Sequence, residues 1–456
     1  MARRIAMAFT LYGLVATILL AINMPPFQNP DEPAQLLRAA QLADGSLVGT
    51  RMPVTDQEGH QFFQGGGLSD PAVRQALLPF DPLVGHPDQK AQRERYTPQV
   101  RWSDSRTMTT FPNTAMYPPF FYIPSALGVL LGRMAGATIV QSLVLSRLLT
   151  GVATVAVAAV AITSSGAAAI WIFAIMTLPM SLALIASPAP DALILGFSAL
   201  AVALMLRWQL QPARPNPGTL AWLTVSLCLV AMARPPYTSL MLPLLALPRV
   251  TWRRRILASA AVILCVGLWV AITAVTTMSN VGAVVHADPA RQLTLLVADP
   301  FRILPLAVST LRHYWRGYVA SFIGILGWLD TELLPGYRIA AIAMLATAAV
   351  AAASGLRRGS GGASSRLLIA IAILIGVASI FVGQYLTWTA PGNDKIEGVQ
   401  GRYFLPLALP VAALLPSLGG ARSARIHQML VLGVVSFPIL SLGVVMRAIV
   451  LRYYLD

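Results

Sequence analysis

Two neighbouring carboxylates, Asp31 and Glu32, follow the first apolar segment of the chain. Charge is costly inside a bilayer, so an acidic pair at this edge either caps a helix or serves a reaction. Pro33 favours a helix start directly after the pair, which supports capping. A pair fixed at a helix start can also position an acceptor hydroxyl or remove its proton. Asp31 and Glu32 are therefore the predicted catalytic residues.

Further polar and aromatic residues lie near the ends of apolar segments, and their types suit a phosphate-bearing lipid and a sugar. Arginine binds phosphate oxygens in pairs, and aromatic rings stack on sugars or lie among headgroups. The predicted substrate-binding residues are Arg38, Tyr117, Arg147, Asp191, Trp328, Asp330, Gln400, Arg402 and Tyr403.

Structural roles compete with several of these assignments. Asp191 follows the proline-rich run 187–190 and could cap a helix. Trp328 and Asp330 end an apolar run and could anchor the chain at the membrane interface. Arg402 enters an apolar segment at its outer end, where it could extend along the segment towards water.

The elements that must position these residues are membrane helices. The chain has 456 residues, of which 56% are hydrophobic and 11% are charged, whereas soluble domains carry about 25% charged residues. Repeated apolar runs of about 20 residues predict a polytopic all-α protein with residues 1–456 in one integral membrane domain. The net charge of +15 comes from clusters between apolar runs. That pattern indicates cytoplasmic loops facing anionic lipid and excludes nucleic acid as the expected partner.

The hydropathy pattern predicts about eleven spans. They are 5–24, 141–163, 166–187, 190–207, 219–233, 236–248, 256–277, 336–354, 367–388, 403–419 and 428–450. Arg3 and Arg4 before the first span resemble a signal peptide. No convincing small-residue cleavage site follows, so an uncleaved span is predicted.

Two arrangements give the same number of crossings, with the N-terminus in the cytoplasm. In the preferred one, 119–132 lies at the outer surface and 219–248 crosses twice, which places the arginine clusters inside. In the other, 119–132 crosses, 219–248 crosses once as a kinked helix, and Arg207 and Arg214 move outside. The side of residues 208–218 distinguishes them.

Three outer segments result: 25–118 with short helices, 279–335, and 389–402. In the second, an amphipathic helix is predicted to lie in the membrane interface. Its apolar stripe is Phe301, Leu304, Val308, Leu311, Trp315 and Tyr318.

Charged side chains are absent from the middle of every predicted span, which argues against an ion-coupled transporter. The two cysteines, Cys228 and Cys265, lie in apolar runs and predict neither a disulfide framework nor a metal site. The five histidines show no ligand spacing. A carboxylate pair could still bind a divalent metal, although no oxygen-rich loop marks such a site. No other cofactor is expected.

The order of several motifs resembles the bacterial membrane family known as domain of unknown function twenty-one forty-two, within the GT-C glycosyltransferase superfamily. The motifs are Pro30-Asp31-Glu32-Pro33, Tyr117-Pro118-Pro119, Ser187-Pro188-Ala189-Pro190-Asp191, Gly327-Trp328-Leu329-Asp330 and Gly398-Val399-Gln400-Gly401-Arg402-Tyr403-Phe404-Leu405-Pro406. The resemblance covers nearly the whole chain.

The resemblance implies a GT-C-like fold in the bacterial inner membrane. It also implies sugar transfer from a polyprenyl-phosphate donor outside the cytoplasm. Asp31 would be the acidic residue that serves the reaction, with Glu32 as the close alternative, and Asp191 would be the second outer acid. One departure is Gln35, where the family usually has histidine. Glutamine cannot take up a proton, so only hydrogen bonding to an acceptor survives at that position.

The predicted function is therefore an inverting glycosyltransferase of the cell envelope. Asp31 acts as base or positions the acceptor, which is a glycan or lipid. Arg402 and Arg147 hold the donor phosphate, and Trp328 and Tyr403 line the sugar or prenyl groove. The rivals are a transporter, flippase or polymerase-like handler of lipid-linked glycans, and a non-catalytic membrane scaffold.

Overall fold

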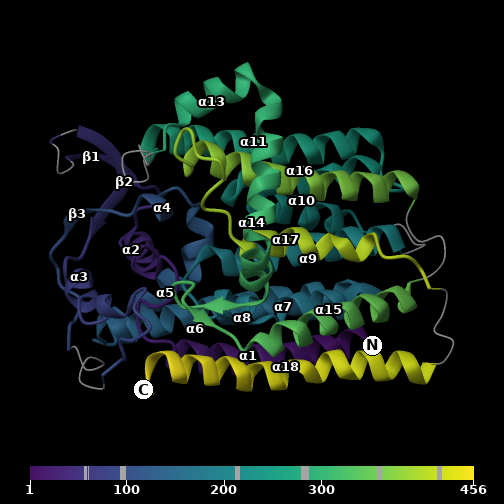
Figure 1. The fold of residues 1–456 in the computed structure, drawn as a ribbon, viewed down its shortest axis with the longest axis horizontal. Coiled ribbons are helices and arrows are strands. Elements are labelled where there is room, and N and C mark those ends of the chain that lie inside the picture. The colour runs from purple at the N-terminus through teal and green to yellow at the C-terminus, as the bar shows by residue number, and fades with distance from the viewer. Residues whose placement is uncertain are drawn as a thin grey trace.

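Long helices lie side by side and form the body of the protein (Figure 1). The computed structural model describes residues 1–55, 59, 61–92, 99–210, 216–278, 287–356, 362–418 and 424–455. Within these residues, seven helices are long and apolar enough to cross a membrane, or up to nine elements if each of two bent helix pairs is one span. The seven are α1 (Ala2–Asn23), α6 (Ile139–Ser164), α9 (Pro190–Leu210), α11 (Trp252–Thr276), α15 (Pro335–Gly355), α16 (Ala363–Thr387) and α18 (Ala424–Tyr453).

The two bent pairs differ in position. The segment 166–176, which ends with α7 (Ala169–Met176), meets α8 (Pro179–Ile185) at 80°. Proline at the start of α8 cannot continue the backbone hydrogen-bond ladder. α13 (Pro289–Ala298) meets the segment that contains α14 (Ile303–Ile323) at 108°. The predicted amphipathic helix is therefore a helix in the structure, with residues 279–286 of its loop outside the described part.

About eleven regular spans were expected, and the described residues form fewer long helices than that. Two of the predicted spans are not regular α-helices. The predicted spans 236–248 and 403–419 are η5 (Pro235–Ala246), a 3₁₀ helix, and the short series η7 (Gly401–Phe404), α17 (Leu405–Ala408) and η8 (Leu409–Ala413). Both segments contain prolines, which remove backbone donors and break α-helical pairing. The preceding α10 (Pro217–Ala233) is apolar but short.

The protein is predominantly helical, as predicted, and one end of it also carries a small sheet. Three antiparallel strands pair in the order β1 (Thr50–Thr55), β2 (Gln61–Ser69) and β3 (Thr107–Thr110). Three consecutive glycines, Gly65 to Gly67, lie in β2. A Cβ at Gly67 would overlap the side chain of Gln41. Glycine thus allows the sheet to pack against α2 (Glu32–Ala43).

Short elements complete the same end of the bundle. They are α3 (Ala72–Leu77), η1 (Asp81–Leu83), α4 (Pro112–Ala115), η3 (Pro119–Tyr122), α5 (Ile123–Met134) and the hairpin β4 (Ile325–Leu326) with β5 (Thr331–Glu332). Two further 3₁₀ turns, η4 (Gly166–Ala168) and η6 (Pro300–Arg302), precede α7 and α14.

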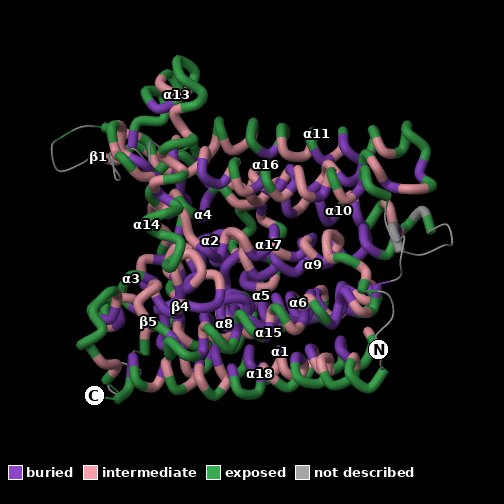
Figure 2. Tube along the Cα trace, turned by 45° about the vertical axis from the view of Figure 1, so that its right-hand side comes forward, coloured by how far each residue is buried: buried purple, intermediate pink, exposed green. Residues whose placement is uncertain are grey.

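The most buried long helix is α9, which is apolar on all sides, as a central helix must be. Figure 2 shows buried residues through the middle of the bundle and exposed ones along α11 and α18. Large apolar side chains such as Leu264 and Ile439 are 71% and 70% exposed there. Such surfaces suit lipid.

A buried ion pair joins three of these elements. Glu32, the first residue of α2, binds Arg147 of α6 through two hydrogen bonds, Nε to Oε1 at 2.8 Å and Nη2 to Oε2 at 2.6 Å. The remaining guanidinium hydrogens go to the carbonyl oxygens of Ala21, near the end of α1, and of Met24 and Pro25, which follow the helix. All five donors of the guanidinium are satisfied, which fixes the start of α2 on α6.

Glu32→Gln is expected to destabilise the protein by about 3–5 kcal/mol, because Arg147 keeps a buried charge without a counter-ion. The free energy of unfolding in mixed detergent micelles measures this. Glu332→Gln is the matched control, since the Glu332–Arg338 pair is exposed and contributes little. Equal losses in both variants would contradict a structural role for the buried pair.

Candidate functional site

Asp31 occupies the N-cap position of α2 but does not cap the helix. Its backbone is left-handed, with φ 59° and ψ 13°, and its side chain makes no cap hydrogen bond. The carboxylate instead accepts a hydrogen bond of 2.7 Å from Nδ2 of Asn113 in α4. Backbone strain of this kind concentrates at functional sites. The capping explanation therefore does not account for the Asp31 side chain.

Asp191 and Arg234 form an ion pair beside it. Arg234 lies between α10 and η5, and its Nη2 is 2.7 Å from Oδ1 of Asp191 at the start of α9. The guanidinium also lies 4.7 Å from the ring centroid of Tyr403 and 5.8 Å from that of Tyr117. Four separate segments thus meet around one arginine.

Tyr403 connects the two arginines of the site. The guanidinium of Arg402 lies 5.7 Å from the centroid of its ring. Its carbonyl oxygen accepts a hydrogen bond of 2.9 Å from the hydroxyl of Tyr237 in η5. The two proline-broken segments, η5 and η7, are therefore joined where each begins.

Arg402 is the cation of this cluster that no described carboxylate pairs with. It is only 8% exposed, and within the described residues no ion pair or hydrogen bond engages its guanidinium, whose Nε is buried without a partner. Buried arginines are normally paired. The arrangement suits a small anion such as a phosphate, which would supply the missing acceptors.

The Asp31 carboxyl is tuned by these neighbours. Burial raises its pKa above the ordinary value, and the charge of Asp191 adds to the rise. Arg402, the hydrogen bond from Asn113 and Arg234 lower the pKa. A carboxylate with a raised pKa that is held by a single neutral partner can accept a proton from a substrate hydroxyl.

The described residues thus bring together Asp31, Tyr117, Asp191, Arg402 and Tyr403 from among those predicted, which we call the acid–arginine cluster together with Asn113, Arg234 and Tyr237. Two carboxylates and two guanidiniums make its formal charge zero. α2, α9 and η5 all begin here, and helix starts carry partial positive charge. An incoming anion would meet a favourable field.

Other predicted site residues are engaged elsewhere. Glu32 and Arg147 satisfy each other, and Asn29 donates to Oε1 of Glu32 at 2.8 Å. Arg38 is fully buried, and it donates to Oε1 of Gln41 and to the carbonyl oxygen of Leu47, each at 2.6 Å. Glu32, Arg147 and Arg38 hold α2 in place, and Arg38 touches the cluster only through a long hydrogen bond of 3.5 Å to the carbonyl oxygen of Tyr117.

Trp328 and Asp330 belong to the turn of the β4–β5 hairpin. The Trp328 indole donates to the carbonyl oxygen of Phe27 at 3.0 Å. Asp330 pairs with Arg452 at the end of α18 at 2.6 Å, with both side chains buried. The hairpin therefore contacts both α18 and the segment before α2. No described contact links the hairpin to the cluster.

Two glutamines remain. Gln400 precedes Arg402, and its Oε1 is buried without a partner in the described part of the chain. Gln35 accepts a hydrogen bond from the hydroxyl of Tyr122. Its carbonyl oxygen is therefore already occupied.

Sequence reasoning missed Asn113, Arg234 and Tyr237 as site residues. Arg234 carried a usable signal, because the preferred arrangement with two crossings places Arg234-Pro235-Pro236 at an outer turn between two apolar segments. Asn113 and Tyr237 carried none, since an asparagine or tyrosine near a span end is common.

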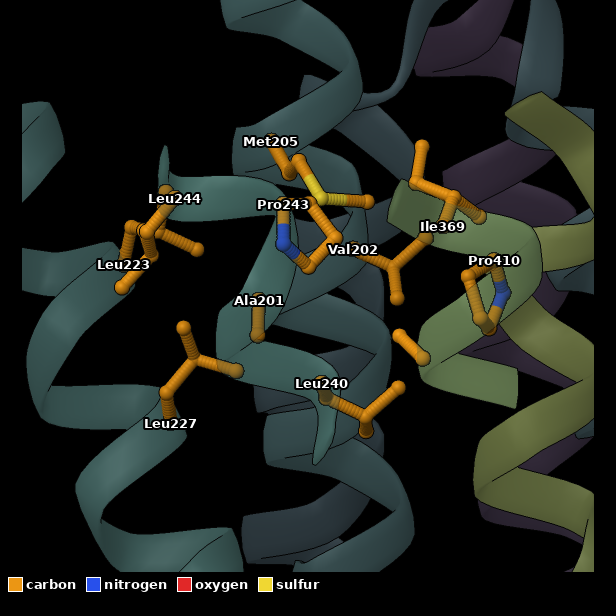
Figure 3. A pocket seen from close by; sticks show the side chains of 11 residues that line it. Ala201, Val202, Met205, Leu223, Leu227, Leu240, Pro243, Leu244, Ile369 and Pro410 are labelled. Carbon is orange, nitrogen blue, oxygen red and sulfur yellow. The ribbon is translucent and has the colours of Figure 1, made fainter. Parts of the chain in front are cut away.

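No group of three or more histidine, cysteine, aspartate or glutamate side chains that could hold a metal comes together in the described residues. Asp31 and Asp191 are the carboxylates that a cation at the cluster would meet. A separate pocket is apolar throughout and lies between α9, α10, η5, α16 and η8 (Figure 3). Leu240, Pro243 and Ile369 line it, so it offers packing space and no catalytic group.

The whole arrangement lies within a recognised family. A search of curated proteins and a search of solved structures each returned no match. A family model described as "Predicted membrane protein (DUF2142)" matches residues 14–411, which include every member of the acid–arginine cluster. The chain belongs to this family of membrane proteins.

Proposed function

We propose that the protein is a GT-C-type glycosyltransferase that moves a sugar from a polyprenyl-phosphate donor to an envelope glycan or lipid on the extracytoplasmic face. The observation that carries this proposal is that a buried Arg402 lies near Asp31 and that, among the described residues, neither of them takes part in an ion pair. An anion site and a candidate base thus lie together at one end of apolar helices.

The path of the chain supports a GT-C-like architecture with about eleven crossings. In this interpretation the bent α7–α8 pair, α10, η5 and the η7–η8 series are crossings in addition to the long helices. Irregular backbone is tolerated at membrane depth where protein covers it. η5 and η8 meet that condition, since they pack against α16.

Charge supports the orientation of a bacterial inner-membrane protein. The N-terminus lies at the end of the bundle away from the sheet, and α18 begins at that same end (Figure 1). Arginines occupy the first turns of α1, α11, α16 and α18, as expected for cytoplasmic ends. Arg214, Arg357, Arg358 and Arg422 lie outside the described residues. The acid–arginine cluster would then face the extracytoplasmic side.

The proposed reaction gives a role to six of the eight cluster residues. Asp31 takes the proton of the acceptor hydroxyl as its oxygen bonds to the anomeric carbon of the donor sugar. The bond from that carbon to the phosphate oxygen breaks, and polyprenyl phosphate leaves with its charge stabilised by Arg402. Asp191 holds Arg234 against Tyr117 and Tyr403, which form an aromatic wall for the sugar. Glu32 and Arg147 take no part, because they satisfy each other.

Asp31→Asn is expected to lower glycosyl transfer by about a hundredfold or more, since an amide cannot accept the proton. The release of polyprenyl phosphate from a labelled polyprenyl-phosphate sugar in detergent, with envelope extract as acceptor, measures this. Turnover without a membrane between compartments would also distinguish an enzyme from a flippase. The envelope glycans of a deletion strain complemented with each variant give a second readout.

Asp44→Asn is the matched control, because Asp44 ends the same helix and pairs with Arg106 and Arg133 at the surface. It should leave turnover unchanged. Full activity of Asp31→Asn would refute the assigned role, and a silent Asp31→Ala phenotype would favour a scaffold.

The pH dependence of kcat/KM should show an acidic limb above the ordinary aspartate pKa of about 3.9. Asp31 must be deprotonated to act, and burial raises its pKa, so activity falls as the pH drops through the raised value. Asn113→Ala removes a hydrogen bond that favours the carboxylate and should move the limb to still higher pH. An unmoved limb would exclude Asp31 as the titrating base.

A tag inserted at Asn216 should not react with a membrane-impermeant label in intact cells, because the preferred arrangement places the α9–α10 connection in the cytoplasm. A tag after Gly45, at the sheet end, should react from outside. Labelling at Asn216 from outside would overturn this orientation of α10.

A further inference from the structure

α14 runs across the other long helices. It stands upright in both views, whereas α11, α15 and α18 lie horizontally (Figures 1 and 2). Helices that span a bilayer run near its normal, so α14 lies close to the membrane plane if the others span.

Its outward surface joins an apolar stripe to a row of cations. The exposed apolar side chains are Phe301, Leu304, Val308, Leu311 and Trp315, between 44% and 75% exposed. Arg312, His313 and Arg316 are exposed beside this stripe, and α14 contains no acidic residue. An apolar stripe with adjacent arginines and a tryptophan is typical of a helix held at the headgroup boundary of an anionic leaflet.

Its inward surface carries the turn that ends in Arg402. The N–H of Gly401 donates to Oγ of Ser321 at 2.8 Å. A Cβ at Gly401 would lie 2.5 Å from the backbone nitrogen of Phe322 and would overlap the carbonyl oxygen of Tyr318. Only glycine allows η7 to approach α14 this closely.

Aromatic packing reinforces the contact. Tyr318 of α14 packs edge-on against Phe404 of η7 and Phe381 of α16, with ring centroids 6.2 Å apart in each case. The loop before η7 is also tied to α14, because the N–H of Ile396 donates to Oγ1 of the buried Thr310 at 2.8 Å. The segment that delivers Arg402 is thus held closely against α14.

We propose that α14 rests in the anionic headgroup layer of the outer leaflet and, through Gly401, holds Arg402 at the depth of a lipid phosphate. Gly401 is then a positioning residue. The role of Arg402 as phosphate ligand rests on the proposed function, whereas the lipid contact of α14 does not. α14 would thereby set the depth of the site relative to the lipid headgroups.

Spin labels test the lipid contact. In a protein with Cys228 and Cys265 replaced by alanine, a nitroxide at Leu311→Cys should collide more with oxygen than with a water-soluble nickel chelate. Labels at Leu264→Cys on α11 and Phe63→Cys on the sheet give the lipid and water references.

In phosphatidylcholine vesicles with added phosphatidylglycerol, the Leu311 label should lie deeper than in phosphatidylcholine alone, and Arg312→Gln with Arg316→Gln should remove that difference. A water-like label would overturn the proposal. A lipid-like label with no response to phosphatidylglycerol would overturn its anionic part.

Gly401→Ala tests whether the contact of Gly401 with α14 positions Arg402. Farnesyl phosphate is the probe, and its thermal stabilisation of the protein is the measurement. Losing one charge-assisted hydrogen bond should weaken binding about tenfold or more, as Arg402→Gln should. Gly317→Ala on the same helix is the matched control, since a Cβ there meets nothing within 4 Å, and it should bind normally.

If Gly401→Ala does not fold, Ser321→Ala replaces it, because it removes only the acceptor of the Gly401 N–H. Normal binding by these variants would overturn the positioning role. A wild-type protein that does not bind farnesyl phosphate would instead refute the donor class of the proposed function, and with it the positioning role. The spin labels would still decide where α14 lies.

Discussion

The buried ion pair between Glu32 and Arg147 is the contact on which the functional end of the protein depends. Without Arg147, the carbonyl oxygens of Ala21 and Met24 would lose their side-chain donor in a low-dielectric interior, where unpaired polar groups are costly. With all five guanidinium donors used, the start of α2 is fixed on α6. The neighbouring Asp31 is consequently fixed as well, although it belongs to no ion pair itself.

At the sheet end of the protein, Arg402 differs from the arginines that are held in ion pairs. Arg147, Arg234 and Arg452 each have a carboxylate partner within 2.7 Å, whereas no described residue pairs with Arg402. Burial of a cation without a partner lowers stability. The two carboxylates of the cluster balance its formal charge.

Prolines determine how the polypeptide reaches this site. A regular helix pairs its own backbone groups, and only the N–H groups of its first turn lack a partner within the helix. In η5 and in the η7–η8 series, prolines interrupt regular α-helix. Arg234 and Arg402 therefore lie at the starts of two irregular segments that continue into the apolar bundle. The close contact of Gly401 with α14 then sets the position of the second arginine.

The sequence alone determined that the protein is a polytopic membrane protein. It also indicated that Asp31, Asp191 and Arg402 have polar roles near span ends, because apolar length and charge placement are local properties. It could not separate Asp31 from Glu32 or Arg402 from Arg147, since each pair has similar residue types in similar contexts. Only the tertiary structure separated them, because it pairs Glu32 with Arg147, whereas among the described residues Asp31 and Arg402 take part in no ion pair. Pairing depends on which helices meet, and that is a property of packing between residues more than a hundred positions apart.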